Sequence, residues 1–317
     1  MPTYNDAILR TGTLGTDTDP LVPEPLIADV IALATQSSAV LSQCATVRMA
    51  AGTSRQPVLS TKALAYWRAG DTGLAQTSSV EWDNVDLVAE NLDVIVPIPR
   101  TYLDDTIVDV WGQVRGELAE AVARKIDGAA LFGTDAPSTF GNSIFEVADA
   151  VGNTIQAGTG DDIAQDVSDL GVLLAEQGYP VRGFFVKPGF QWQLVGLRSA
   201  DGVPIYQPDL KNAGGGGLFG MPLNEVANGA WASASASLIA GDFTKAIVGI
   251  RQDAQWEIST QSVIQDGSGN IVYNLFQQDM VALKLSLRYA FATANPVTAI
   301  EDSALERAPF AVLTPGT

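Results

Sequence analysis

The longest helical pattern in the chain covers residues 104–133, where apolar residues recur at steps of three and four and so share one face of an α-helix. They are Ile107, Val110, Trp111, Val114, Leu118, Ala121, Val122, Ile126 and Ala129. The first turn of a helix favours carboxylates, so Asp104 and Asp105 mark the expected start. A glycine in the left-handed conformation commonly ends a helix, so Gly133 marks the expected end. At ~1.5 Å per residue this spine helix would be roughly 40 Å long. On this pattern alone, an ordinary core helix of an α+β enzyme is the favoured interpretation.

A long two-stranded ribbon is predicted before this helix. Strand-like runs at about 55–67 and 80–96 flank a turn-rich centre at 69–79. An isolated ribbon of two strands is at best marginally stable in water, so either a neighbouring subunit or its own domain must cover it. Three aromatic residues are spaced through the ribbon, and large aromatics dominate interface energetics. We expect them to be contact anchors between subunits, with packing inside their own subunit as the alternative: Tyr66, Trp67 and Trp82.

Shorter patterns predict the remaining elements. Helices are expected at 26–33 and 161–177, and a third helix is expected to begin at Pro188. Residues 133–160 have the composition of a loop. Strands are expected at 40–49, 183–187, 238–240, 246–250, 256–259, 271–275 and 281–288.

The composition excludes several classes of function. The 317 residues are 46% hydrophobic and 17% charged, which is enough apolar material for a packed core. The net charge of −18 argues against a general nucleic-acid-binding surface, although a local basic patch is still allowed. The absence of histidine removes Ser–His–Asp, Cys–His and His-ligand metal chemistry. The single cysteine, Cys44, lies in an apolar segment and is expected to be buried.

No motif in the chain predicts catalysis, a cofactor or a metal. The glycines at 214–217 are not followed by the Lys-Ser/Thr of a phosphate-binding loop. The oxygen-bearing residues at 266–270 lack the spacing of a calcium loop, and a β-turn explains them. Neither a secretory signal nor a membrane-spanning segment is expected. The carboxylate pairs at 104–105 and 117–120 are better explained by helix capping and solvation than by acid–base chemistry.

The order of the segments resembles the major capsid proteins of tailed bacteriophages with the HK97-type fold. The resemblance covers nearly the whole chain, in eight segments that are each weak but are specific together. They are Leu21-Val-Pro-Glu-Pro-Leu-Ile, Ala65-Tyr-Trp-Arg-Ala-Gly-Asp-Thr-Gly, Val94-Ile-Val-Pro-Ile-Pro-Arg-Thr-Tyr-Leu-Asp-Asp, Ala129-Ala-Leu-Phe-Gly-Thr, Val186-Lys-Pro-Gly-Phe, residues 194–204 with their Asp-Gly turn, Phe219-Gly-Met-Pro-Leu and Ile239-Ala-Gly-Asp-Phe.

This resemblance implies an α+β, HK97-like capsid fold and a structural function without enzymatic activity. The subunit would assemble as hexamers and pentamers into an icosahedral shell around phage double-stranded DNA. The implied division has an N-terminal arm at 1–32, a peripheral-domain strand at 33–49, an extended hairpin (the E-loop) at 50–92, the peripheral domain with the spine helix at 93–145, an axial domain at 146–247, and peripheral strands with a C-terminal tail at 248–317.

The resemblance also implies partners. Besides copies of itself, the subunit is expected to use a separate scaffolding protein, a portal and a cement protein, with assembly in the bacterial cytoplasm. Some relatives join an E-loop lysine covalently to a peripheral-domain asparagine. Here residues 63–123 contain no lysine and Asp279 stands at the acceptor position, so no such cross-link is expected. An encapsulin-like compartment and a soluble α+β enzyme or binding protein are the alternatives.

Overall fold

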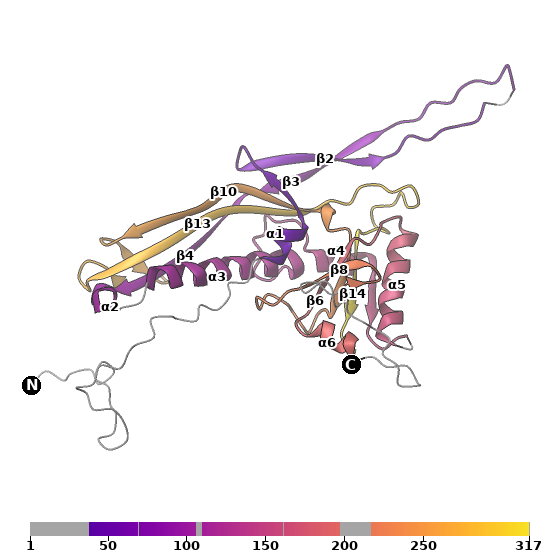
Figure 1. The fold of residues 1–317 in the computed structure, drawn as a ribbon. Helices are drawn as coiled ribbons and strands as arrows, with labels where there is room; N and C mark the ends of the chain where they lie inside the picture. Colours follow the sequence, from indigo (N-terminus) through magenta and orange to yellow (C-terminus); the bar gives the residue numbers. More distant parts are fainter. Residues whose placement is uncertain (1–37, 69, 106–109, 161, 197–216, 317) are drawn as a thin grey trace, which may run out of the picture.

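The protein has an α+β fold in which two sheets share one core and a ribbon projects from them (Figure 1). The structure is a computed structural model that describes residues 38–68, 70–105, 110–160, 162–196 and 217–316. The expected α+β class is therefore confirmed. The helix predicted at 26–33 and the rest of the arm lie outside the described residues.

The first sheet carries the spine helix on one face (Figure 1). Its strand order is β1-β10-β13-β4, with β1 parallel to β10 and the other pairs antiparallel. The strands are β1 (Ala45–Arg48), β10 (Ala246–Ser259), β13 (Met280–Thr293) and β4 (Glu90–Pro99). Helix α3 (Val110–Phe132) packs its apolar face against β13, and the contacts join Leu118, Val122 and Ile126 to Leu283, Leu285 and Leu287. The 246–250 and 256–259 patterns are thus parts of one long strand.

The spine helix is confirmed along most of its length, but its predicted start is wrong. Helix α3 has 23 residues, or about 34 Å at the usual rise. It is followed by Gly133, whose φ of +68° is the left-handed conformation expected of a cap. Asp104 and Asp105 lie in helix α2 (Arg100–Asp105), which begins at Arg100, so these two carboxylates do not mark a helix start. The strand expected at 40–49 is also corrected, because helix α1 (Ala39–Gln43) precedes β1.

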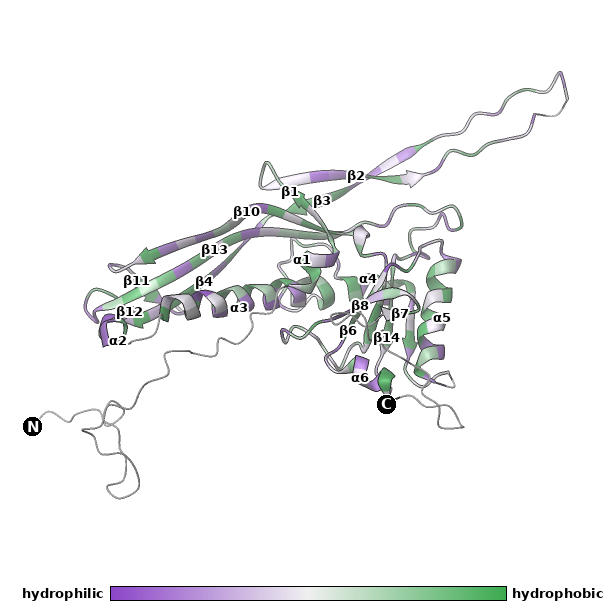
Figure 2. Ribbon diagram, viewed as in Figure 1, coloured by the Kyte–Doolittle hydropathy of each residue, from purple (hydrophilic) through white to green (hydrophobic). Residues whose placement is uncertain are grey.

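The second sheet has six strands in the order β5-β14-β9-β6-β8-β7. Strands β6 (Gly183–Val186) and β14 (Phe310–Thr314) are hydrophobic and buried at its centre (Figure 2). Helix α5 (Ile163–Glu176) covers it with Val167, Leu170 and Leu174, as the 161–177 pattern predicts. Helix α6 (Phe190–Val195) begins after Gly189, so Pro188 precedes the helix and does not open it. The other strands are β5 (Thr154–Gln156), β7 (Gly217–Leu218), β8 (Met221–Glu225) and β9 (Leu238–Gly241), with the short 3-10 helix η1 (Phe243–Lys245) after β9.

Two parts of the chain differ from the expected organisation. Residues 133–160 are not a continuous loop, because helix α4 (Ile144–Val151) and strand β5 lie within them. In addition, the tail does not stay with the peripheral strands. Strand β14 pairs with β5 and β9, so the end of the chain completes the sheet of the expected axial domain.

One hydrophobic cluster joins the two sheets. Ala130 and Leu131 at the end of the spine helix pack with Phe185 of β6 and Phe310 of β14. Val248 and Phe291 of the first sheet belong to the same cluster. The spine helix therefore ends inside the shared core, which fixes the two sheets relative to each other.

Candidate intersubunit surface

The ribbon of β2 (Thr53–Thr61) and β3 (Glu81–Val88) is anchored at its base. Leu87 and Ala89 pack with Met49 and Ile247 in a buried cluster. The Ala89 amide also donates to the Gly52 carbonyl at 2.8 Å. Because these contacts tie both strands to the first sheet, the ribbon leaves the body in a defined direction.

The outer part of the ribbon has no cover from the described part of its own chain. Figure 1 shows it running well beyond both sheets. Arg55 and Asp86 form an exposed ion pair of 2.8 Å between the two strands. Further out, the amide of Leu64 donates to the Ser78 hydroxyl at 2.7 Å, so the two sides still contact each other beyond the strands. Leu64 and Leu74 are also exposed there, at 61% and 91%.

The three predicted anchors all lie on this ribbon and all face solvent. Trp82 is in β3, pairs with Leu59 of β2 and is 65% exposed. Tyr66 and Trp67 follow β2 and are 51% and 102% exposed. The structure thus places Tyr66 beside Trp67 near the end of the ribbon and Trp82 nearer its base, without bringing the three into one cluster. Among the described residues, each of these side chains is at least half exposed, so the surface that the three offer is open to another molecule.

A second apolar surface was missed by the sequence analysis. Strands β11 (Val263–Gln265) and β12 (Ile271–Asn274) form a hairpin at the far end of the first sheet from the ribbon (Figures 1 and 2). Its turn was predicted, and the Asp266 carboxylate accepts hydrogen bonds from the backbone amides of Ser268 and Asn270. These bonds lower the pKa of Asp266. Around the turn, the exposed apolar side chains are Val263, Ile271, Val272, Tyr273 and Phe276. The sequence could have revealed this surface, because apolar residues occupy both faces of these two short strands.

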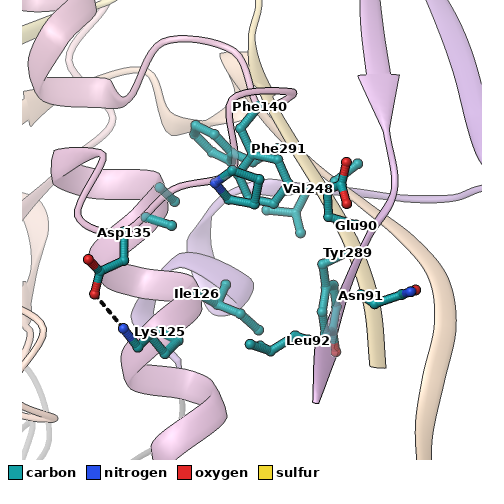
Figure 3. Close-up of a pocket in the computed structure, with 14 residues that line it drawn as sticks. Glu90, Asn91, Leu92, Lys125, Ile126, Asp135, Phe140, Val248, Tyr289 and Phe291 are labelled. Carbon is teal, nitrogen blue, oxygen red and sulfur yellow. Dashed lines mark hydrogen bonds and ion pairs between the residues drawn. The ribbon is translucent and has the colours of Figure 1, made fainter. Parts of the chain in front are cut away.

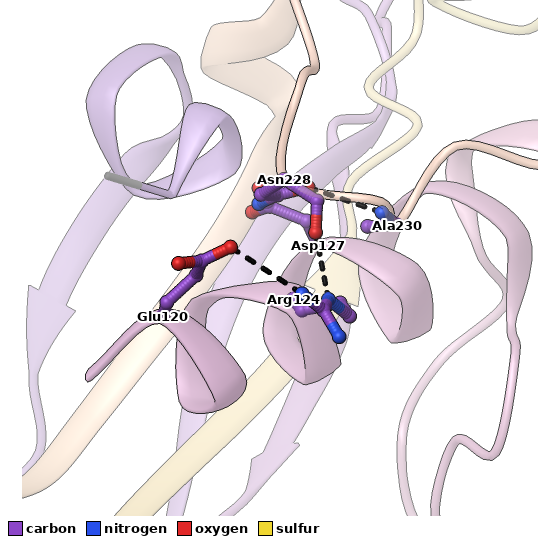
Figure 4. Close-up of polar contacts among 5 residues, drawn as sticks. All are labelled: Glu120, Arg124, Asp127, Asn228 and Ala230. Carbon is purple, nitrogen blue, oxygen red and sulfur yellow. Dashed lines mark hydrogen bonds and ion pairs between the residues drawn. The ribbon is translucent and has the colours of Figure 1, made fainter. Parts of the chain in front are cut away.

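A buried polar network fixes the middle of the molecule (Figure 4). The Asp127 carboxylate on the spine helix is fully buried and accepts from the Asn228 amide at 2.6 Å. Arg124 donates to the Asn228 carbonyl at 2.7 Å and to Glu120 at 3.3 Å. Ala230 in turn donates its backbone N–H to the Asn228 side chain at 3.1 Å. Sequence periodicity does not reveal this role, because the partners are about a hundred residues apart.

A cavity of about 280 Å³ lies between the spine helix and the first sheet (Figure 3). Most of its lining is apolar, with Ile126, Tyr289 and Phe291 among the side chains. The three charged side chains in its lining already have partners. Lys125 and Asp135 form an exposed ion pair of 2.5 Å that lowers the pKa of Asp135, and Glu90 accepts from Thr139 at 2.8 Å. The cavity thus offers packing space but no arrangement of groups for acid–base work.

The Cys44 thiol also has a structural explanation. Burial raises the pKa of the Cys44 thiol to about 12, with a further contribution from the charge of Asp127, so this thiol is not an activated nucleophile. Within the described ranges, no three His, Cys, Asp or Glu side chains come together as a metal would require.

Among the described residues, no helix is both long and apolar enough to cross a bilayer.

Comparison with known proteins identifies the fold. Residues 19–301 match the phage capsid family, and the chain belongs to that family. It is 28% identical to the major capsid protein of Staphylococcus phage 80alpha over 234 residues, which are 73% of this chain and 68% of the relative. A solved structure from Microbacterium phage Oxtober96 is 34% identical, with a TM-score of 0.82 over 93% of this chain and 96% of the other. One from Mycobacterium phage Adephagia is 28% identical, with a TM-score of 0.83 over 100% and 99%.

These findings confirm the HK97-like capsid fold and the tailed-phage major capsid class. The chain is a structural subunit that assembles with copies of itself into a capsid shell, and it belongs to the virion.

Proposed function

We propose that the subunit forms hexamers and pentamers that close into an icosahedral shell around phage double-stranded DNA. The observation that carries this proposal is the ribbon of 53–88, which is anchored at its base and which no other described segment covers beyond it. Full exposure of a tryptophan is costly for a lone subunit, because a large apolar side chain stays in water. The exposed side chain stabilises an assembly when an identical neighbouring subunit covers it. A closed shell repeats that contact at every equivalent interface.

The parts of the fold take the roles that the resemblance implies. The ribbon is the E-loop, and its anchors on a neighbouring subunit are Tyr66, Trp67 and Trp82. The first sheet with the spine helix is the peripheral domain, and the six-stranded sheet is the axial domain at the symmetry axes. Strand β14 belongs to the axial domain in this scheme, because it pairs with β5 and β9.

Shell stability in this proposal comes from non-covalent contacts. The ribbon carries no lysine beyond Lys62. At the expected acceptor position, Asp279 has its carboxylate 3.5 Å from the Arg100 guanidinium, and its carbonyl accepts from the Arg100 amide at 3.0 Å. These contacts give Asp279 a local role in holding β4 against β13. Particles boiled in detergent should therefore run as one subunit-sized band on a denaturing gel.

The partners follow from the same scheme. A separate scaffolding protein guides assembly in the host cytoplasm, a portal occupies one vertex, and a cement protein adds stability from outside. The net charge of −18 suits a wall that does not adhere to packaged DNA, because like charges repel. DNA binding by the subunit would then be neither tight nor sequence-specific.

Electron microscopy of the purified protein, with and without its scaffolding protein, tests the proposal. We expect closed particles with five-fold and six-fold clusters of subunits and, after infection, nuclease-resistant double-stranded DNA inside. A monomer or small oligomer under every condition would contradict the shell. Closed particles filled with an enzyme instead of DNA would contradict the genome-packaging role alone.

A further inference from the structure

A groove of about 300 Å³ runs between the spine helix and the outer part of β10. Residues of both elements line it, and its floor comes from β13. The main lining side chains are Ala119, Val122, Ile126, Trp256, Leu285 and Leu287. Beyond Ile250, strand β10 has no pairing with β1, so this side of the sheet is a free edge among the described residues. Trp256 is 40% exposed on this edge, with the Arg115 guanidinium 5.9 Å from the centre of its ring, and most of the other lining side chains are apolar.

The start of the described chain is fixed in the same place. Ser38 lines the groove, and its hydroxyl donates to the buried Asp127 carboxylate. The backbone amides of Ala39 and Val40 donate to the same carboxylate at 3.0 and 3.2 Å. Because Asp127 follows Ile126 on the spine helix, the preceding part of the chain must begin at the Ile126 end of the groove.

The sequence just before Ser38 has the character that this groove needs. Residues 26–33, outside the described part of the chain, have the pattern of an amphipathic helix with Ile27, Val30 and Ile31 on one face. Such a helix would be about 12 Å long, and the groove extends about 10 Å along the spine helix from Ala119 to Ile126. The four residues 34–37 can span up to ~13 Å, which is enough to turn the segment back onto the groove.

We infer that residues 26–33 pack into this groove of their own chain, with Ile27 and Ile31 against Trp256 and the spine helix. A linker of four residues gives the segment a high effective concentration at the groove, so it competes well against the same segment of another copy. Only the first part of the arm then remains for contacts with other molecules. This inference concerns the folded subunit and does not depend on the proposed shell geometry.

Photo-crosslinking tests the occupant of the groove. A benzoylphenylalanine at Ala119 lies in the groove, and one at Glu117 is a matched control on the exposed surface of the same helix. Light and ¹⁵N-labelled chains are mixed before assembly, so that each cross-linked peptide pair shows whether it joins one chain or two. We expect Ala119 to cross-link to residues 21–37 of its own chain and Glu117 not to do so. Cross-links from Ala119 to a second copy, to other proteins or to nothing would overturn the inference.

A pair of double variants separates packing from general disruption. Ile27→Asp with Ile31→Asp should reduce the Ala119 cross-link at least about tenfold, because two apolar contacts are lost. Ala28→Asp with Ala32→Asp adds the same charge on the side of the helix opposite Val30 and should reduce the cross-link much less. Equal effects of both pairs would contradict the docking. Electron micrographs of the same samples keep the two questions apart, since closed particles without the cross-link would refute only the groove inference.

Discussion

The side-chain amide of Asn228 donates a 2.6 Å hydrogen bond to the Asp127 carboxylate and so joins the segment after β8 to the spine helix. The same carboxylate accepts from Ser38, Ala39 and Val40 at the start of helix α1. One buried charge therefore holds three distant segments together. Such a group is stabilising only while all its donors remain paired with it.

Replacing Asp127 with Asn should destabilise the subunit by about 1–3 kcal/mol, since the new amide group would face backbone N–H donors. Urea unfolding of subunits purified before assembly measures this loss. Glu117→Gln is the matched control, because Glu117 is exposed on the same helix, and it should change stability by less than about 0.5 kcal/mol. Equal stability of the Asp127 variant and the wild type would show that the network contributes nothing.

The thiol of Cys44 should report on unfolding. It is the only cysteine, it is buried, and burial raises its pKa to about 12. At pH 8 the native thiolate fraction is then about a thousandfold lower than that of an ordinary thiol. Reaction with a thiol reagent should accordingly be very slow in the native subunit and fast in urea. Native and unfolded rates within tenfold of each other would contradict the burial of Cys44.

Tyr179 should make stability fall at high pH. Its hydroxyl is 2.6 Å from the Pro296 carbonyl oxygen and 2.8 Å from the Asn295 side-chain oxygen, and burial raises its pKa to about 12. The folded state therefore keeps this proton more tightly than the unfolded state, whose pKa is near 10. The contribution is complete below about pH 10 and is lost as the pH rises to about 12.

Urea midpoints at pH 9, 10.5 and 11.5 measure that dependence. The Tyr179→Phe variant should lose less stability across this range than the wild type. Tyr66→Phe is the control, because Tyr66 is exposed on the ribbon and should leave the slope unchanged. Identical slopes in all three proteins would refute the assignment to Tyr179.

The fold was predictable where one element carries its own periodic signal. The spine helix and α5 each have an apolar stripe long enough to be recognised, and glycines at positive φ, Gly133 and Gly178, follow them. Helix α4 was missed because it is short and its neighbourhood is rich in Gly and Asp. Its capping box of Ser143 and Glu146 was present in the sequence and could have revealed it.

Contacts between segments far apart in the chain were harder to predict from the sequence. The five residues of β14 read as a strand or a tail equally well, and only the completed sheet shows that they belong beside β5 and β9. The network around Asp127 depends in the same way on Asn228, which no local pattern brings near. By contrast, the exposure of Trp67 followed from a local argument, since a ribbon of two strands has little to bury its aromatic residues against.

Trp67 provides the most direct test of the account, which holds that the ribbon binds a neighbouring subunit in a shell. Gradient sedimentation and electron microscopy should show that Trp67→Ala lowers the yield of closed particles at least about tenfold, as expected for a buried aromatic anchor. The urea midpoint of the unassembled variant should stay the same, because Trp67 contacts little of its own subunit. Trp67→Phe should retain most of the assembly. A Trp67→Ala variant that assembles like the wild type, or that loses assembly only by failing to fold, would contradict the account.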